Sequence, residues 1–231
     1  MSDRQLIRDI VDSRIVHRMS PQEIARKHPV LFHSTRPEAL AGIRKHGLLT
    51  TRDLVHLFEL SEESRNDVYG KIRRTDMTIE HPVHGRATIS DNIPLSEKAL
   101  ESCLDDGLTV GSWLDILSRR VFFWPDVKHL CSHLQATSRR GVNRAVMVVD
   151  TLGLVSAHFE QCEISAINSG STIRRPARRG LQTFTKLAGT EYTTWQKMRG
   201  KKDTIKEVVI RASVVDISEH LVEVKSSTDF I

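Results

Sequence analysis

Apolar residues recur at helical spacing at the start of the chain and in short unbroken runs farther along it. Residues 3–18 place apolar side chains three or four positions apart, which predicts a helix. Ser20 followed by Pro21 predicts the start of a second, short helix, because serine caps helices and proline is tolerated at their first position. The amino-terminal part is therefore predicted to be helical.

The segment that follows alternates strand and helix patterns. Residues 29–33 form a brief apolar run rich in β-favouring side chains, which predicts a buried strand. Residues 37–46 place Leu40 and Ile43 on one face and end before Gly47, a residue typical of the position after a helix. The pattern of this segment therefore predicts a strand followed by a helix that ends at Gly47.

The middle of the chain is predicted to hold helices around one aromatic strand. Residues 61–94 are polar, charged and rich in turn residues, so we expect a long loop there, with at most a short strand over 87–89. The aromatic strand is expected over 120–124 and is stopped by Pro125. Helices are predicted over residues 51–60, 96–105, 109–117 and 128–135.

The last third of the chain is predicted to be rich in strands. Residues 145–150 form the clearest fully buried strand pattern, whereas 183–195 fits neither a helix nor a strand better. Further strands are expected over 163–167, 205–212, 214–217 and 221–224. The fold class is therefore α+β, with a helical extension over 1–28, one domain over 29–225 and a tail over 226–231.

Composition supports one globular unit. The chain has 231 residues, 39% of them hydrophobic, which is enough for a sizeable core. Three cysteines without a CxxC spacing argue against a disulfide framework and a cysteine-rich zinc site. The first residues lack the apolar stretch of a signal peptide, and no run is long enough to span a membrane. A cytoplasmic protein without a membrane partner is expected.

The charge is basic and unevenly distributed. The formal net charge is +5, and basic residues raise the local concentration of polyanions by long-range attraction, so a nucleic-acid partner is expected. Solvated surface is the competing interpretation of each basic cluster. The clusters are Lys71, Arg73 and Arg74; Arg174, Arg175, Arg178 and Arg179; and Arg199, Lys201 and Lys202.

A search for common motifs excludes several kinds of site. The sequence has no GxxxxGK[ST] loop and no HExxH, GxGxxG or GxSxG motif. His81 and His84, with Asp76, are of metal-ligand type, but two histidines in a polar loop are more often solvated. No metal is expected.

The segment Leu31 to Thr35, followed by a helix pattern ending at Gly47, resembles the first conserved block of the ADP-ribosyltransferase superfamily. The similarity is closest to the DarT-like DNA-modifying branch, the RNA 2′-phosphotransferases and an uncharacterised bacterial domain family of the superfamily. Three further blocks follow in the expected order and extend the resemblance over roughly residues 29–225. They are the aromatic strand at 120–124, the central strand at 145–150 and a glutamate-containing strand at 206–210.

The resemblance implies a split, mostly antiparallel pair of sheets around a cleft for NAD, the co-substrate. Glu207 would be the catalytic carboxylate and His33 a catalytic and ribose-binding residue, with Ser34 and Thr35 close to the nicotinamide amide. Phe122 or Phe123 would stack on the nicotinamide ring, only one of the two pointing into the cleft. An arginine would pair with the pyrophosphate. The candidates are Arg52, Arg73, Arg86 and Arg120.

Base rates favour plainer roles for the same residues. A histidine after an apolar strand is usually a satisfied, partly buried side chain, and a glutamate opening a strand is usually at the surface. Phe122 and Phe123 belong to a core patch in most proteins. Only the combination of blocks in the expected order raises His33 and Glu207 above these interpretations.

Departures from the superfamily pattern bear on the acceptor. Ile205 stands two positions before Glu207, where arginine-modifying enzymes have a second acid, so modification of arginine is disfavoured. The aromatic loop of the DarT-like branch is not reproduced over residues 61–94.

Several functions remain open at this stage. We expect ADP-ribosylation of nucleic acid, with a DNA base favoured, in a toxin or anti-phage effector that has a cognate antitoxin or hydrolase. The alternatives are an NAD glycohydrolase, a non-catalytic nucleic-acid or ligand-binding module on the same scaffold, and a metal-independent nuclease or phosphotransferase that uses His33.

Overall fold

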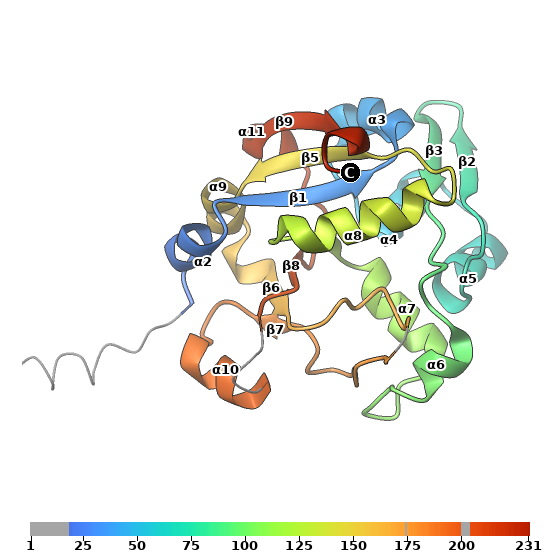
Figure 1. Ribbon diagram of the computed structural model, residues 1–231. Coiled ribbons are helices and arrows are strands. Elements are labelled where there is room, and N and C mark those ends of the chain that lie inside the picture. Colours follow the sequence, from blue (N-terminus) through green and yellow to red (C-terminus); the bar gives the residue numbers. More distant parts are fainter. Residues whose placement is uncertain (1–18, 174, 200–203) are drawn as a thin grey trace, which may run out of the picture.

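The computed structural model describes residues 19–173, 175–199 and 204–231. The helix expected over 3–18 lies outside the described residues, as do Arg174, Lys201 and Lys202. The described chain is α+β, as predicted, with two antiparallel sheets, a separate hairpin and helices around them (Figure 1).

The first sheet has three antiparallel strands, with β5 at its centre. His33 of β1 lies opposite Met147 of β5, and Thr35 lies opposite Ala145 at the end of the ladder. The strands are, in spatial order, β1 (Val30–Thr35), β5 (Ala145–Asp150) and β9 (Leu221–Ser226).

The second sheet has four antiparallel strands and meets the first sheet where β1 approaches β4. Phe32 and Trp124 form an isolated bridge there, each amide donating to the other's carbonyl at 3.0 and 2.8 Å. The strands are, in spatial order, β4 (Val121–Phe123), β8 (Glu207–Ile210), β6 (Cys162–Ser165) and β7 (Thr185–Lys186).

Helices enclose the sheets on their outer sides (Figure 1). The α-helices are α2 (Pro21–Lys27), α3 (Leu40–His46), α4 (Thr51–Leu57), α5 (Glu62–Gly70), α6 (Glu97–Glu101), α7 (Val110–Ser118), α8 (Val127–Ser138), α9 (Thr151–Ala157), α10 (Tyr192–Arg199) and α11 (Ile217–His220). Short 3₁₀ helices are η1 (Pro37–Ala39), η2 (Phe159–Gln161) and η3 (Ser227–Asp229).

The largest hydrophobic core joins the two sheets. Leu31 and Met147 of the first sheet pack with Phe123 and Val208 of the second, because alternate strand residues face the same side. A smaller core on the other face of the first sheet packs α8 onto Phe32 and neighbouring side chains. Helix α8 lies along β1 (Figure 1).

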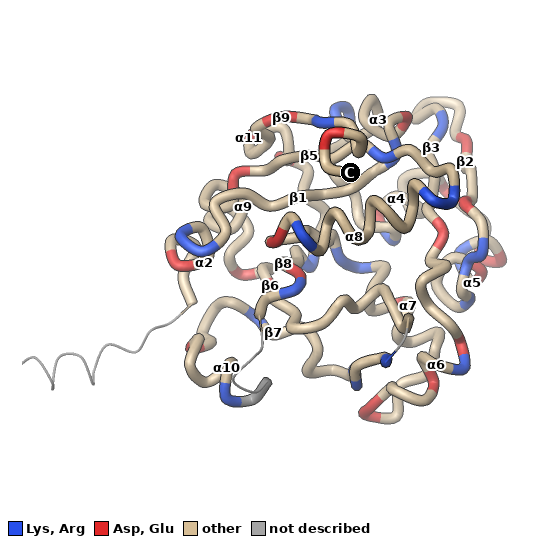
Figure 2. Tube along the Cα trace, viewed as in Figure 1, with Lys and Arg blue, Asp and Glu red and all other residues tan. Residues whose placement is uncertain are grey.

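Charges of both signs are interspersed around the outside of the molecule (Figure 2). Strand β1 has no charged residue, and β5 has only the terminal Asp150. Arginines stand where the ladder between these strands ends, Arg36 directly after β1 and Arg144 directly before β5.

The loop expected over residues 61–94 is the main error of the sequence prediction. The segment forms α5, which Ser61 caps by accepting a hydrogen bond from the Ser64 amide, and a hairpin of β2 (Met77–His81) and β3 (Gly85–Ile89). One buried apolar side chain anchors α5 and one anchors each strand, too few for the periodicity to stand out.

The strand expected over 214–217 is also absent as such. Val214 makes a single bridge with Leu48, and the chain then turns into α11. The ambiguous segment 183–195 holds the short strand β7 and the start of α10. The other predicted strands are confirmed within a few residues of their expected ends.

Candidate functional site

His33 lies on β1 beside the second sheet. Its Nδ1 is 2.9 Å from the carbonyl oxygen of Phe122, and because a carbonyl only accepts, Nδ1 carries the proton. Burial lowers the pKa of His33, and the positive charge of Arg144 lowers it further, which favours the neutral imidazole. Nε2 is then a lone-pair acceptor, with no partner among the residues that the structure describes.

Glu207 is the first residue of β8 and lies opposite Ser165 of β6. Its carboxylate is buried, with only 4% of the residue exposed. Oε1 accepts a hydrogen bond of 3.0 Å from the Ser169 amide, whereas Oε2 has no partner in the described part of the chain. Burial raises the pKa of Glu207 to about 7, opposed by the hydrogen-bonding influence of the Ser169 side chain and amide and by the charge of Arg179. A buried, half-satisfied carboxylate of this kind is uncommon outside functional sites.

A single strand, β4, separates His33 from Glu207, and alternation puts Glu207 on the Phe122 face while His33 lies on the Phe123 face. β4 bridges β1 through Trp124 and pairs with β8, and continuing the β4–β8 register by one residue places Trp124 opposite Glu207. Neighbouring strands lie roughly 5 Å apart, so the backbones of the two residues are separated by about two strand spacings.

The aromatic residues of β4 divide between the two faces of the strand. Phe123 is fully buried, and its ring centroid lies 5.7 Å from that of His33. Phe122 is partly buried and lies opposite Val209, so alternation puts it on the same face as Glu207. Of the two stacking candidates, Phe122 is therefore the one on the side of the carboxylate.

The loop after β6 holds Glu207 in place. Arg179 donates from Nη1 to the Ser169 carbonyl at 2.9 Å and from Nη2 to the Ser171 carbonyl at 3.0 Å. The loop then presents the Ser169 amide to Glu207, and the buried Ser169 hydroxyl lies close enough to the carboxylate to lower its pKa without making a hydrogen bond of ordinary geometry. From the sequence, residues 168–171 are interpreted as a turn after a strand that could contact a ligand, and Ser169 is not assigned to the site.

Ser34 and Thr35 follow His33 on β1, as the site prediction requires. The hydroxyl of Ser34 is buried and has no hydrogen-bond partner within the described ranges. Thr35 is partly buried at the end of the ladder with β5.

Arg73 and Arg120, two of the pyrophosphate candidates, are held by the protein itself. Arg73 donates to the carbonyl of Val68 at 2.5 Å and to a second carbonyl in the loop after β3. Arg120 donates to Glu163 at 2.8 Å, and both side chains are largely buried. Neither guanidinium is free to bind a phosphate.

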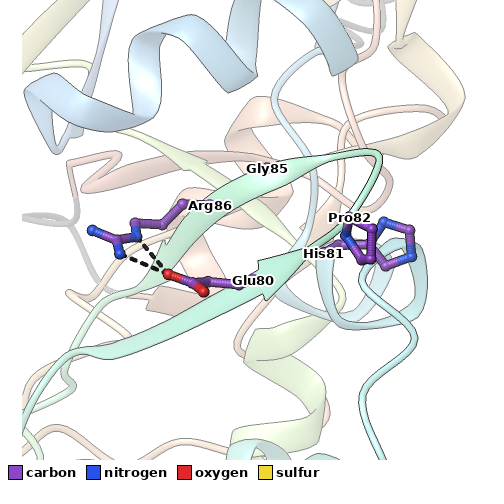
Figure 3. A pocket seen from close by; sticks show the side chains of 5 residues that line it. All are labelled: Glu80, His81, Pro82, Gly85 and Arg86. Atoms are coloured by element: carbon purple, nitrogen blue, oxygen red, sulfur yellow. Dashed lines mark hydrogen bonds and ion pairs between the residues drawn. The ribbon is translucent and has the colours of Figure 1, made fainter.

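Arg52 and Arg86 lie at other surfaces of the molecule. Arg52 pairs with Asp115 at 2.5 Å. Arg86 pairs with Glu80 across the exposed hairpin, where it borders an open hollow of about 460 Å³ (Figure 3). Neither His33 nor Glu207 lines that hollow.

The basic segment at residues 174–179 is only partly exposed. Arg174 lies outside the described residues, Arg175 is exposed, and Arg178 is exposed and paired with Asp105. Only 2% of Arg179 is exposed, and its guanidinium donates hydrogen bonds to carbonyl groups inside the protein. The prediction that Arg179 contacts nucleic acid is corrected here, because its donors are enclosed.

Among the described residues, the group with the spacing of metal ligands is not the one considered from the sequence. Asp76, considered with His81 and His84, pairs with Arg36 instead. Elsewhere in the described chain, His158, Asp216 and His220 place ligand atoms within 4.8 Å of one another. Both rings hydrogen-bond the Asp216 carboxylate, at 2.8 and 3.1 Å, so this group is satisfied without an ion.

Comparisons with known proteins identify the family of the chain. No helix within the described residues is long and apolar enough to cross a membrane. Searches of curated proteins and of solved structures give no match. Residues 29–221 match a family described as a family of unknown function, DUF7002. The match spans most of the chain, which therefore belongs to the family DUF7002.

Proposed function

We propose that this protein is an NAD-dependent ADP-ribosyltransferase, with Glu207 as its catalytic carboxylate. The observation that carries the proposal is the buried Glu207 carboxylate, one oxygen of which has no partner in the described chain. That oxygen is available to a ribose hydroxyl or to an acceptor proton. The pKa of about 7 lets the group be ionised or protonated near neutrality, as general acid–base catalysis requires.

The chemistry follows from the two polar groups. When the glycosidic bond of NAD breaks, its electron pair leaves with nicotinamide and the ribose gains positive charge. Ionised Glu207 stabilises that charge and takes the proton of the incoming acceptor. Neutral His33 offers Nε2 to a ribose hydroxyl, its orientation fixed by the Phe122 carbonyl.

The arrangement of strands supports the same proposal. In an ADP-ribosyltransferase-like core, the strand with the histidine, the aromatic strand and the strand with the glutamate line one cleft. Here β1, β4 and β8 are neighbours in that order. Phe122 is the residue we assign to stacking against nicotinamide, since it shares the Glu207 face.

For the acceptor we propose nucleic acid, with a DNA base favoured. The formal net charge of +5 and the exposed Arg175 and Arg178 support an anionic partner. A cytoplasmic toxin or anti-phage effector with a cognate antitoxin or hydrolase fits this activity. Water as acceptor would make the protein an NAD glycohydrolase with the same residues.

The test is nicotinamide release and label transfer from NAD labelled in its ADP-ribose part, with DNA, RNA and cell lysate as separate acceptors. Wild type, Glu207→Gln and the control Glu223→Gln are compared, Glu223 being an exposed strand residue. We expect activity in wild type and control and a loss of at least about 100-fold in Glu207→Gln. Binding of nucleic acid without NAD consumption would favour the non-catalytic module.

A further inference from the structure

Arg144 is a buried cation without a counter-ion in the described structure. It stands directly before β5 and is only 7% exposed. Its Nε is buried without a partner, and no hydrogen bond from its guanidinium to another described residue is present. An unpaired buried charge costs several kcal/mol, so a protein keeps one where a ligand supplies the missing charge.

Two further donors share its place in the fold. The β1–β5 register ends with Thr35 opposite Ala145, so the next step sets Arg36 against Arg144. Alternation puts Ser34 on the same face as these two arginines. The hydroxyl of Ser34 and the Nε of Arg36 are also buried without partners. Three unpartnered donors therefore gather where the ladder ends.

The nearby acids do not balance the positive charge. Arg36 pairs with Asp76, and Arg140 pairs with Asp91 at 3.2 Å. Arg144 has no ion pair of its own among the described residues: burial and the charge of Arg36 lower its pKa, the charges of Asp76 and Asp91 raise it, and the charge of Arg140 lowers it. Like charges opposite one another across strands are destabilising, which an anion between them would reverse.

We propose that Arg144, Arg36 and Ser34 form a binding site for a phosphate-type oxyanion. The oxygens of the ligand accept the hydrogen bonds that these donors lack. The guanidinium of Arg144 donates two parallel hydrogen bonds to the oxyanion. Ser34 and Arg36 follow His33 by one and three residues, and alternation puts their side chains on the face of the first sheet opposite to that of His33.

This inference extends the proposed function without depending on it. The oxyanion has two sources, the pyrophosphate of the dinucleotide and a backbone phosphate of a nucleic-acid acceptor. The other arginines considered for the pyrophosphate are paired or held by carbonyl groups of the protein, whereas Arg144 has no such partner within the described residues.

The test measures thermal unfolding of the full chain at low ionic strength with inorganic pyrophosphate, ADP, adenosine and a short DNA strand. Wild type is compared with Arg144→Gln, Arg144→Lys and Arg26→Gln, the last removing an exposed arginine. We expect pyrophosphate to raise the unfolding temperature of wild type and Arg26→Gln, with at least a tenfold weaker apparent affinity in Arg144→Gln. The apparent affinity of Arg144→Lys for pyrophosphate should lie between those of wild type and Arg144→Gln, since lysine keeps the charge but lacks the planar guanidinium that donates two parallel hydrogen bonds.

The outcomes separate the sources and the two proposals. Stabilisation by ADP but not by adenosine or DNA assigns the site to the dinucleotide, and stabilisation by DNA that requires Arg144 assigns it to the acceptor. Arg144→Gln should unfold at no lower temperature than wild type without ligand, because it removes an unpaired charge. Equal stabilisation of wild type and Arg144→Gln, or none of wild type by any anion, would overturn the site. Anion binding without NAD turnover would retain the site and reject the transferase.

Discussion

Burial gives Glu207 an electrostatic cost that the proposed catalytic role would explain. The rise in its pKa from the ordinary 4.5 to about 7 means that the folded state binds the proton more tightly than the unfolded chain does. Stability from this group is fully present below pH 4.5 and is lost as pH rises through 7. The loss amounts to roughly 3 kcal/mol above pH 7, at about 1.4 kcal/mol per pKa unit.

Replacing Glu207 by glutamine should therefore stabilise the protein while abolishing its activity. The amide oxygen still accepts from the Ser169 amide, and no buried charge remains. At pH 8 we expect a higher free energy of unfolding in denaturant titrations than wild type, by about 1–3 kcal/mol. A lower value at pH 8 would show that the ionised carboxylate is well compensated in the fold.

Arg178 and Arg179 are adjacent in sequence and differ in role. Arg179→Met leaves the carbonyl groups of Ser169 and Ser171 without their donors and should lower the free energy of unfolding by at least about 2 kcal/mol. Arg178→Met, at an exposed ion pair, should leave stability unchanged within error. Urea titrations of both variants give the comparison. Equal effects of the two substitutions would contradict the assignment of Arg179 to the loop.

At the scale of elements, the turn at Gly47 fixes the direction in which the chain leaves α3. Gly47 has φ of +80°, and a Cβ there would stand 2.3 Å from the backbone Cα of Val215. Gly47→Ala should therefore destabilise the protein by more than the roughly 1–3 kcal/mol of a strained backbone alone.

The matched control for this prediction is Gly42→Ala, inside α3. A Cβ at Gly42 meets no atom within 4 Å, and alanine favours helix, so this variant should gain about 0.5–1 kcal/mol. Thermal unfolding of the two single variants measures both effects. A tolerated Gly47→Ala would mean that the chain can leave α3 by another path.

Strands were easier to predict than the segments between them. The run over 145–150 forms β5 because a strand buried on both faces leaves an unbroken apolar run. Helix α5 and the hairpin escaped prediction because each buries very few apolar side chains, so turn residues dominate their composition. Local patterns thus identify elements that are packed on several sides.

The arrangement of the candidate site also could not be predicted from local sequence patterns, because its residues are far apart in the sequence. His33 and Glu207 were predicted from the order of blocks that resemble a known superfamily, but the placement of β4 between their strands depends on strand order, which no local pattern encodes. Arg144 went unnoticed because an arginine before a strand looks like surface. Only the burial of its guanidinium and its lack of a counter-ion distinguish it.

For the whole molecule, buried histidines should limit stability in acid. Burial lowers the pKa of His133 to about 4, with Arg144 contributing, and burial also lowers that of His33. A lowered histidine pKa gives stability that is present above the ordinary value of 6.5 and is lost as pH falls toward 4. Between about pH 6.5 and 4.5 the contributions of His133 and Glu207 nearly cancel, so the loss of stability of wild type in this range should come from other buried histidines such as His33.

Comparing His133→Gln with wild type between pH 7 and 4 isolates one of these contributions. The variant cannot take up a proton in the unfolded state, so its free energy of unfolding should fall less with acidification, by up to roughly 3 kcal/mol at pH 4. Chemical denaturation across this range is the measurement. Parallel curves for the two proteins would show that His133 is protonated normally in the fold.

The most direct test of the account is the pH dependence of nicotinamide release from NAD by wild type and Glu207→Gln. The account predicts that kcat/KM of wild type rises with pH, reaches a plateau with an apparent pKa near 7, and falls by at least about 100-fold in the variant. Folded wild-type protein that releases no nicotinamide with any acceptor, or a variant as active as wild type, would contradict it.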